Sequence, residues 1–157
     1  MLAEINPQKN NSGINQPEFL KENNLYLEES QLAGKGVFSS TGFNKGDTIE
    51  RCPLILFTDK DLEYLPHTNL YQYCCIPGHK NSTRFLALGY GAFYNHDAPS
   101  NAECTINENE KICTIKAVRS ITANEEITIN YNGAYNDNTE VVFATKNEVY
   151  DFSVNLF

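Results

Sequence analysis

Short apolar segments separated by turn residues make up most of the chain from Leu25 onward. Their alternation of apolar and polar positions predicts β-strands, and glycine and proline residues punctuate them. The predicted strands cover residues 25–27, 37–38, 48–57, 70–76 and 126–131. Many short strands with turns between them favour an all-β or β-rich fold over a parallel α/β sheet.

The last of these segments, 126–131, has the sequence EITINY. Side chains alternate between the two faces of a strand, so Ile127 and Ile129 fall on one face and Thr128 on the other. The segment is therefore expected to be a strand with an apolar face directed into the core.

The stretch 102–121 predicts a β-hairpin, because apolar residues flank a polar turn of sequence NENEK. With Glu108 and Asn109 as the turn, Cys104 and Cys113 face each other across the two strands. We expect two packed thiols at this position and no disulfide bond.

One short segment, 59–65, is expected to be helical. Thr58 or Asp59 is its candidate N-cap, because the side-chain oxygen of either residue can accept a backbone N–H of the first turn.

The length of 157 residues predicts one folded domain. Residues 1–20 are rich in Asn, Gln, Pro and Ser and are expected to form a flexible leader, followed by a folded domain over 21–137. Residues 138–157 end in an alternating apolar tail, which predicts either a lid over the site or an edge strand at a dimer contact. No run of about 18 apolar residues occurs, so neither a membrane span nor a membrane partner is expected.

Acidic residues outnumber basic ones, 20 against 12, giving a net charge of −8. The charge is −3 over residues 1–30, −2 over 31–131 and −3 over 132–157. Without a basic cluster, direct binding to nucleic acid is not expected. The acidic ends either attract a cationic partner or serve only to keep the chain soluble.

Cysteine and histidine residues do not form a metal-binding pattern. The five cysteines are an odd number without a C-x-x-C pair, and the three histidines lack the spacing of zinc ligands. We therefore expect reduced thiols, a cytosol-like compartment and no metal.

Three separated segments carry the candidate chemistry: AGKGVF at 33–38, LALGYGAFYNHDAPSNA at 86–102 and EEITINY at 125–131. In the first, Gly34 and Gly36 allow a tight turn that brings backbone amides close to the charged end of a ligand. Taken alone, two such glycines can equally form nothing more than a surface turn.

The second and third segments add polar side chains. Asn95 and His96 lie within an apolar stretch, so each needs a hydrogen-bond partner if buried, supplied either by a ligand or by the other residue. Tyr131 ends the third segment, and Tyr135 follows four residues later. A tyrosine at a strand end ordinarily packs within the fold, and only the order of all three segments points to a binding site.

In this order the three segments resemble SET-domain protein lysine methyltransferases, over roughly residues 25–135. The family pattern N-H-x-x-x-P-N is met at Asn95, His96 and Asn101, with the proline shifted to Pro99 and Asp97 in place of the usual Ser. The spacing is most similar to the minimal stand-alone viral and bacterial SET domains. The resemblance implies a β-rich fold of several small sheets, few short helices and a C-terminal pseudoknot.

The resemblance also implies S-adenosylmethionine as the cofactor. The backbone at Gly34, Lys35 and Gly36 would hold its methionine end, and Asn95 and His96 would hold the remainder, largely through main-chain contacts at the adenine.

For catalysis the resemblance implies three tyrosines. Tyr131 matches the catalytic tyrosine of the family and would also contact the cofactor, while Tyr135 would wall the lysine channel or stack on the adenine. A further site tyrosine is either Tyr71 or Tyr73, and Tyr71 is favoured because Tyr71-Gln72-Tyr73 fits the family's Tyr-x-aromatic pattern.

The implied substrate is a lysine of a histone or another basic protein or peptide. A homodimer is a further expectation, because the viral relative is one. The implied location is the cytoplasm or nucleus, or a host cell into which the protein is delivered. The competing interpretation, motivated by Asp97 and Pro99, is a catalytically silent SET-like module that binds a peptide or the cofactor.

Overall fold

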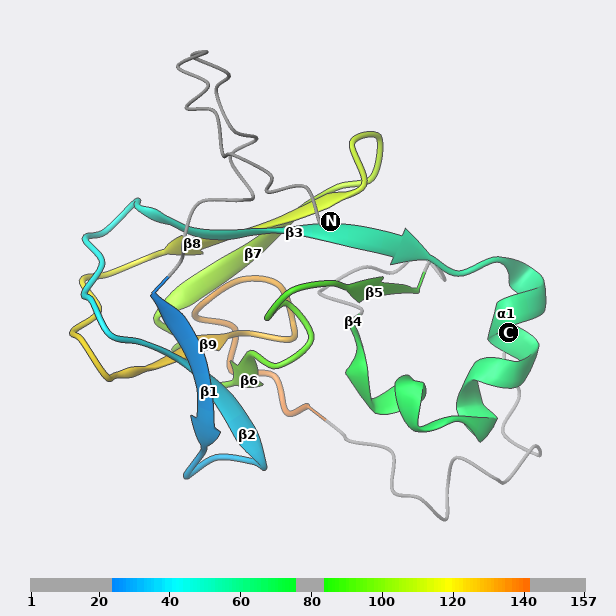
Figure 1. The fold of residues 1–157 in the computed structure, drawn as a ribbon, viewed down its shortest axis with the longest axis horizontal. Coiled ribbons are helices and arrows are strands. Elements are labelled where there is room, and N and C mark those ends of the chain that lie inside the picture. The colour runs from blue at the N-terminus through cyan, green and yellow to red at the C-terminus, as the bar shows by residue number, and fades with distance from the viewer. Residues whose placement is uncertain (1–23, 76–83, 142–157) are drawn as a thin grey trace, which may run out of the picture.

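The computed structural model describes residues 24–75 and 84–141, which form two β-sheets and a small helical arm (Figure 1). The first sheet has four strands in the order β1-β2-β9-β6. These are β1 Leu25–Glu29, β2 Lys35–Ser39, β9 Glu126–Ile129 and β6 Asn95–His96. The second has five strands in the order β4-β5-β3-β8-β7. These are β4 Cys74–Cys75, β5 Phe85–Ala87, β3 Thr48–Leu56, β8 Ile112–Ala117 and β7 Ala102–Asn107.

The β-rich fold predicted from the apolar pattern is confirmed. Strands form at 25–29, 35–39, 48–56 and 126–129, each overlapping a predicted segment. In β9, Ile127 and Ile129 are buried on one face, and Thr128 on the other face is buried where its N–H and hydroxyl bond Asn101.

Strand β9 brings distant segments together. It pairs antiparallel with β2 and parallel with β6. Beyond β6, the Asp97 N–H donates to the Ile129 carbonyl at 3.2 Å and the Ser100 N–H donates to the Tyr135 carbonyl at 2.9 Å. The C-terminal segment thus runs along the loop 97–101, which is the contact expected of a C-terminal pseudoknot.

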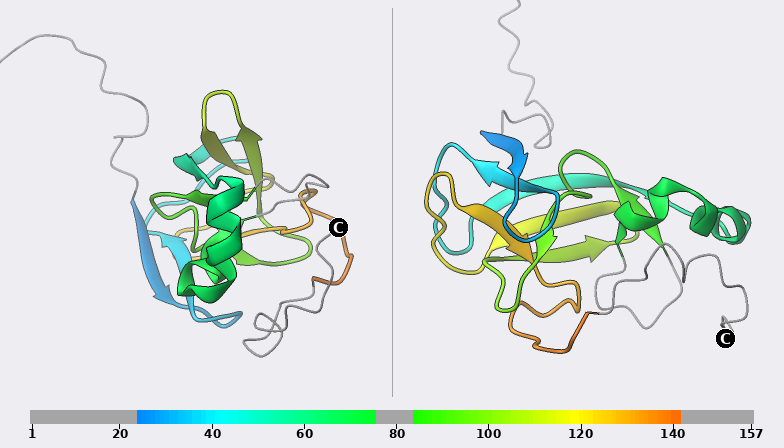
Figure 2. Two further views of the ribbon diagram at one scale, coloured as in Figure 1. Left: turned by 90° about the vertical axis from the view of Figure 1, so that its right-hand side faces the viewer. Right: turned by 90° about the horizontal axis from the view of Figure 1, so that it is seen from below.

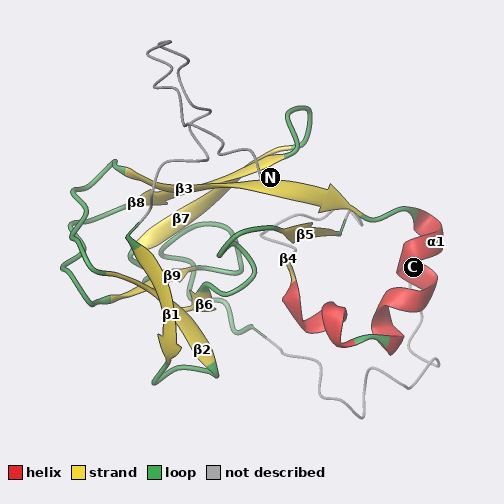
Figure 3. Ribbon diagram, in the orientation of Figure 1, coloured by secondary structure: helices red, strands yellow, loops and turns green. Residues whose placement is uncertain are grey.

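The helical arm lies at one end of the molecule, away from the β1–β2 hairpin (Figures 2 and 3). It contains helix α1 Asp59–Tyr64 and the 3₁₀ helices η2 Leu65–His67 and η3 Asn69–Tyr73. The predicted helix is confirmed, with Thr58 as its N-cap. The strand predicted over 70–76 is wrong for most of its length, since only β4 is a strand and Ile76 lies outside the described residues. No side chain of η3 is buried, so no sheet face stabilises an extended conformation there.

The β7–β8 hairpin forms as predicted, but in a different register. Cys104 pairs with Ile115, and Ile106 pairs with Cys113. The connection contains the four residues 108–111 rather than two, with Lys111 at a φ of 53°. The prediction that Cys104 and Cys113 are directly opposite is therefore wrong, although their sulfur atoms lie diagonally only 2.7 Å apart and both remain thiols.

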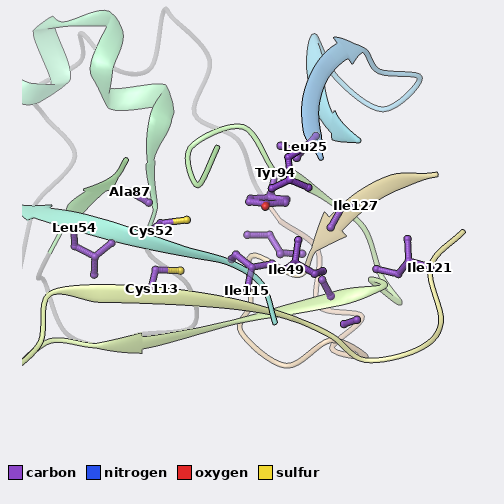
Figure 4. Packing of buried hydrophobic residues seen from close by; sticks show 14 of the residues in the cluster. Leu25, Ile49, Cys52, Leu54, Ala87, Tyr94, Cys113, Ile115, Ile121 and Ile127 are labelled. Atoms are coloured by element: carbon purple, nitrogen blue, oxygen red, sulfur yellow. The ribbon is translucent and has the colours of Figure 1, made fainter. Parts of the chain in front are cut away.

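The core lies between the two sheets (Figure 4). Tyr94 is its largest fully buried side chain. It lies beside Leu25 of β1 and Ile127 of β9, and opposite Ile49 and Ile115 of the second sheet. This packing fixes the segment that leads into β6.

The expected leader and most of the expected lid or dimer segment lie outside the described residues. Within the described part, no helix is long and apolar enough to cross a membrane.

Candidate active site

The turn between β1 and β2 is shaped by Ser30 and two glycines. The Ser30 hydroxyl oxygen accepts the N–H groups of Leu32 and Ala33, at 2.8 and 3.3 Å. Gly34 has a φ of 48°, a left-handed conformation that glycine adopts without steric cost. Gly36 is buried, and a Cβ added there would overlap the carboxylate of Glu126. One glycine therefore makes the turn, and the other allows close approach.

Glu126, the first residue of β9, joins the turn to β6. Its two carboxylate oxygens accept the Ser30 hydroxyl at 2.8 Å each, and Oε1 also accepts Asn95 Nδ2 at 2.8 Å. Asn95 Nδ2 is further directed at the Ala33 carbonyl at 3.0 Å and the Lys35 carbonyl at 3.4 Å. An amide nitrogen has two hydrogens, so these acceptors use its full capacity. In the described part of the chain, Asn95 Oδ1 accepts no hydrogen bond and can receive one from a ligand.

His96 and Tyr131 are held against each other. The Tyr131 N–H donates to His96 Nδ1 at 3.1 Å, so the neutral ring would carry its hydrogen on Nε2. The two ring centroids lie 5.3 Å apart at an interplanar angle of 42°. The Tyr131 hydroxyl donates to the Tyr94 carbonyl at 2.9 Å, which directs the phenol toward residues 94–96.

Asn101 fastens the loop after β6 to β9. It is 1% exposed, its Nδ2 donates to the Glu126 carbonyl at 2.7 Å, and its Oδ1 accepts the Thr128 N–H at 2.8 Å. Its Nδ2 also reaches Glu125 Oε1 at 3.1 Å. One buried amide thus fixes where β9 lies relative to the second motif.

Glu125 carries the neighbouring ion pair, at 2.7 Å from the guanidinium of Arg119. Burial alone would raise the pKa of Glu125. Hydrogen bonds from Arg119, the Thr122 N–H and Asn101 outweigh that effect and lower the pKa to about 2. The carboxylate is therefore ionised over the whole physiological pH range.

Most of the predicted site residues converge. The Lys35 carbonyl accepts from Asn95 Nδ2, and Gly36 lies against Asn95 and the Glu126 carboxylate, with Gly34 in the same turn. His96 is the last residue of β6, and Tyr131, two residues beyond the end of β9, donates its N–H to the His96 ring. The Lys35 side chain points outward and pairs with Glu29 at 3.0 Å.

The other two predicted tyrosines, Tyr135 and Tyr71, have contacts outside this group of residues. Tyr135 is 43% exposed, and its carbonyl binds Ser100.

Tyr71 lies in η3, where Arg84 donates to its hydroxyl at 3.3 Å and stacks over its ring at 4.7 Å. Tyr73, the alternative, packs against Phe93 with ring centroids 5.7 Å apart. Phe93 immediately precedes Tyr94, whose carbonyl accepts the Tyr131 hydroxyl. The preference for Tyr71 over Tyr73 stays a prediction.

Sequence reasoning missed Ser30, Glu126 and the carbonyl of Tyr94 as parts of the site. The acidic pair before the strand in EEITINY is the signal that could have indicated Glu126, because one carboxylate of such a pair can point back across the sheet. Among the described residues, no group of three or more His, Cys, Asp or Glu side chains is placed to hold a metal ion.

Comparison with known proteins agrees with this geometry. The profile of the SET domain matches residues 34–132. The histone-lysine N-methyltransferase of Schizosaccharomyces pombe named as specific for H3 lysine-37 is 27% identical over 108 residues, which are 68% of this chain and 72% of that protein.

Solved structures are also similar. A crystal structure of a candidate histone methyltransferase of Plasmodium falciparum has a TM-score of 0.55 and 30% identity, over 70% of this chain and 98% of that one. A humanized Polycomb Repressive Complex 2 of Chaetomium thermophilum, bound to an inhibitor, has a TM-score of 0.56. It is 19% identical, covering 68% of this chain and 14% of that one, and supports the fold alone. With the family profile spanning most of the chain and all three motifs, this protein belongs to the SET-domain family of protein-lysine methyltransferases.

Proposed function

We propose that this protein transfers a methyl group from S-adenosylmethionine to the ε-amine of a lysine in a histone or another basic protein. The observation that carries the proposal is the convergence of three distant segments. The glycine turn, the Asn95–His96 strand and Tyr131 meet around the Glu126 carboxylate and the Tyr94 carbonyl.

The residues present fit S-adenosylmethionine. The Asn95 Oδ1 can accept from the ammonium of its methionine end, since Nδ2 is fully engaged with protein acceptors. A Cβ added at Gly34 would meet no atom within 4 Å, so the turn borders open space. When bound, the cofactor supplies a methyl group on a positively charged sulfur.

The protein must also provide a neutral lysine amine, since the unperturbed pKa of lysine is near 10.4. A narrow channel beside Tyr131 would disfavour the ammonium by desolvation, and the nearby positive sulfur would add like-charge repulsion. Release of the proton to water then needs no carboxylate base.

Tyr131 would orient the reacting groups. Its hydroxyl hydrogen is directed at the Tyr94 carbonyl, so the phenol oxygen can orient the methyl group through a weak C–H···O contact. Alignment of amine, methyl and sulfur is the main source of rate, because oriented reactants can gain about 7 to 11 kcal/mol.

Charge and the named relatives support a basic substrate. The net charge of −8 would attract a lysine-rich tail electrostatically. Two of the similar proteins carry histone methyltransferase names. A homodimer and a cytoplasmic or nuclear location remain part of the proposal.

One departure from the family pattern, Asp97 in place of Ser, keeps the backbone contact between this loop and the end of β9. Asp97 is exposed and its carboxylate accepts the Ala98 N–H at 2.8 Å. Its own N–H still pairs with the Ile129 carbonyl at 3.2 Å. The exchange of Ser for Asp therefore gives no support to a silent binding module.

The test combines calorimetric titration with S-adenosylmethionine and radiolabelled methyl transfer to core histones and to cell lysate. We expect binding and transfer by the wild-type protein, and a loss of kcat of about a hundredfold in Tyr131→Phe. Tyr26→Phe is the matched control, because it removes an exposed hydroxyl that bonds Asn124 at 2.9 Å away from the site. Cofactor binding without transfer to any protein would support the silent module, and absence of cofactor binding would contradict the proposed transfer and leave only a module that binds a peptide.

A further inference from the structure

Glu50 is a buried acid that the proposed mechanism does not use. It lies in β3 and is only 8% exposed. Burial raises its pKa, although hydrogen bonds from the Tyr90 N–H and the Tyr94 hydroxyl act in the opposite direction. Placing a carboxyl group in a core is unfavourable unless its oxygens are well bonded, so its partners indicate what it does.

The Glu50 carboxyl holds both ends of one turn. Its Oε1 accepts the Tyr90 N–H at 3.0 Å, and its Oε2 accepts the Tyr94 hydroxyl at 2.9 Å. Gly89 has a φ of 70°, and a Cβ added there would overlap Oε1. The turn 89–94 is therefore built around this single side chain. The thiols of Cys52 and Cys113, on β3 and β8, are the other titratable groups facing it.

The carbonyl that accepts the Tyr131 hydroxyl belongs to Tyr94, the last residue of the same turn. The Tyr94 carbonyl accepts the Tyr131 hydroxyl at 2.9 Å, and β6 with its two site residues begins at the next position. The Tyr94 ring is 2% exposed and lies beside Leu25 and Ile127 (Figure 4). Because the ring is buried, the hydrogen bond from its hydroxyl to Glu50 determines the position of Tyr94 along the long axis of the ring.

We propose that Glu50 is a positioning residue, which through the Tyr94 hydroxyl fixes the carbonyl that holds the Tyr131 phenol and thereby sets the rate of methyl transfer. This inference rests on the proposed function. It assigns Glu50 no contact with substrate or cofactor.

The test measures kcat, KM for a histone peptide and cofactor affinity in four variants: Tyr94→Phe, Glu50→Ala, Glu50→Gln and the double variant Glu50→Ala/Tyr94→Phe. Rates are divided by the active fraction, taken from the stoichiometry of cofactor binding in calorimetry. We expect kcat to fall about tenfold in Tyr94→Phe and in Glu50→Ala, with KM changed less than about twofold.

Two results separate positioning from mere stabilisation. Glu50→Gln should keep kcat within about twofold of wild type, because its amide can accept from the Tyr90 N–H and donate to the Tyr94 oxygen. The double variant should lose no more than Glu50→Ala alone, since both changes break the same contact.

Ile121→Val is the control, because it trims a buried core residue whose backbone pairs with Phe43, outside the turn 89–94. It should lower thermal stability and leave kcat per active site unchanged. Wild-type kcat in Tyr94→Phe and Glu50→Ala, or an equal loss in Ile121→Val, would overturn the positioning role. A wild-type protein that binds no cofactor or transfers no methyl group would instead contradict the proposed function.

Discussion

At Gly36 the lack of a side chain allows three segments to meet. The Glu126 carboxylate and Asn95 Nδ2 occupy the space that a Cβ would need. The carboxylate cannot easily move aside, because Ser30 and Asn95 hold it with hydrogen bonds of 2.8 Å. Glycine is therefore required at position 36 because there is no space for a Cβ atom, and not because the backbone needs its flexibility.

Gly36→Ala is expected to destabilise the fold by about 1 to 3 kcal/mol, as inserting an atom into a packed site does. It should also weaken S-adenosylmethionine binding, because displacing Glu126 releases Asn95. Urea unfolding and calorimetric titration measure the two effects. Gly46→Ala is the control, since Gly46 has a φ of 91° and open space around it. That variant should lose stability through backbone strain yet bind the cofactor as wild type does, and equal weakening in both variants would contradict the argument.

Individual residues were predictable where a motif names them. Asn95, His96 and Tyr131 stand out in the sequence because polar groups interrupt apolar runs. Glu126 is marked only by the acidic pair that opens EEITINY, and that pattern does not say which of the two carboxylates turns toward the site. Its partner Asn95 lies 31 positions away, and local pattern carries no information about such a pairing.

At the scale of elements, local chemistry and tertiary packing compete. The cap of α1 was readable because the contacts are local: the Asp61 N–H donates to the Thr58 hydroxyl at 3.3 Å, and the Thr58 N–H donates back to Asp61 at 2.8 Å. The strand predicted over 70–76 failed where η3 forms, a segment whose side chains are all at least partly exposed and are therefore not held against a sheet. The hairpin register failed because the turn has four residues, which shifts the pairing of Cys104 from Cys113 to Ile115.

Thr58→Ala should weaken α1 locally by about 1 kcal/mol, the usual cost of losing an N-cap. None of the α1 side chains is buried, so the loss should be confined to the arm. Hydrogen exchange of the amides of 59–64 should accelerate about fivefold, while amides of β8 keep their wild-type rates. Thr58→Ser retains a capping hydroxyl and is the matched control. Acceleration in β8 as well would show that the arm and the body open together.

At the scale of the whole molecule, the order of the three motifs carried more information than any single strand. It predicted the family and the meeting of the motifs, which the parallel pairing of β6 with β9 brings about. It did not predict how burial and charge are distributed inside the domain. Glu50 and Glu125 are both glutamates in short β-rich contexts, yet the fold shifts their pKa values in opposite directions.

Together, the opposite pKa shifts of Glu50 and Glu125 predict that their joint contribution to the free energy of unfolding is greatest in mildly acidic solution. The pKa of Glu125 falls from 4.5 to about 2 on folding, so below pH 4.5 the unfolded chain binds more protons there. Its stabilising contribution is complete above pH 4.5 and is lost as the pH falls toward 2. The pKa of Glu50 is raised above 4.5, so its contribution is complete below that pH and is lost as the pH rises through the folded value.

Comparing the free energy of unfolding of each variant with that of wild type isolates the contribution of one carboxyl group. The free energy of unfolding, from urea titrations between pH 2.5 and 8, should decline less steeply on the acid side in Glu125→Gln, by roughly 1 kcal/mol because the Arg119 pair is partly solvent-screened. In Glu50→Gln the decline on the alkaline side should be reduced, because the amide keeps the partners of Glu50 without a charge to bury. Arg119→Gln removes the cation beside Glu125 and should reproduce part of the acid-side change while leaving the alkaline side as in wild type. An alkaline slope that persists unchanged in Glu50→Gln would mean that the buried acid does not govern it.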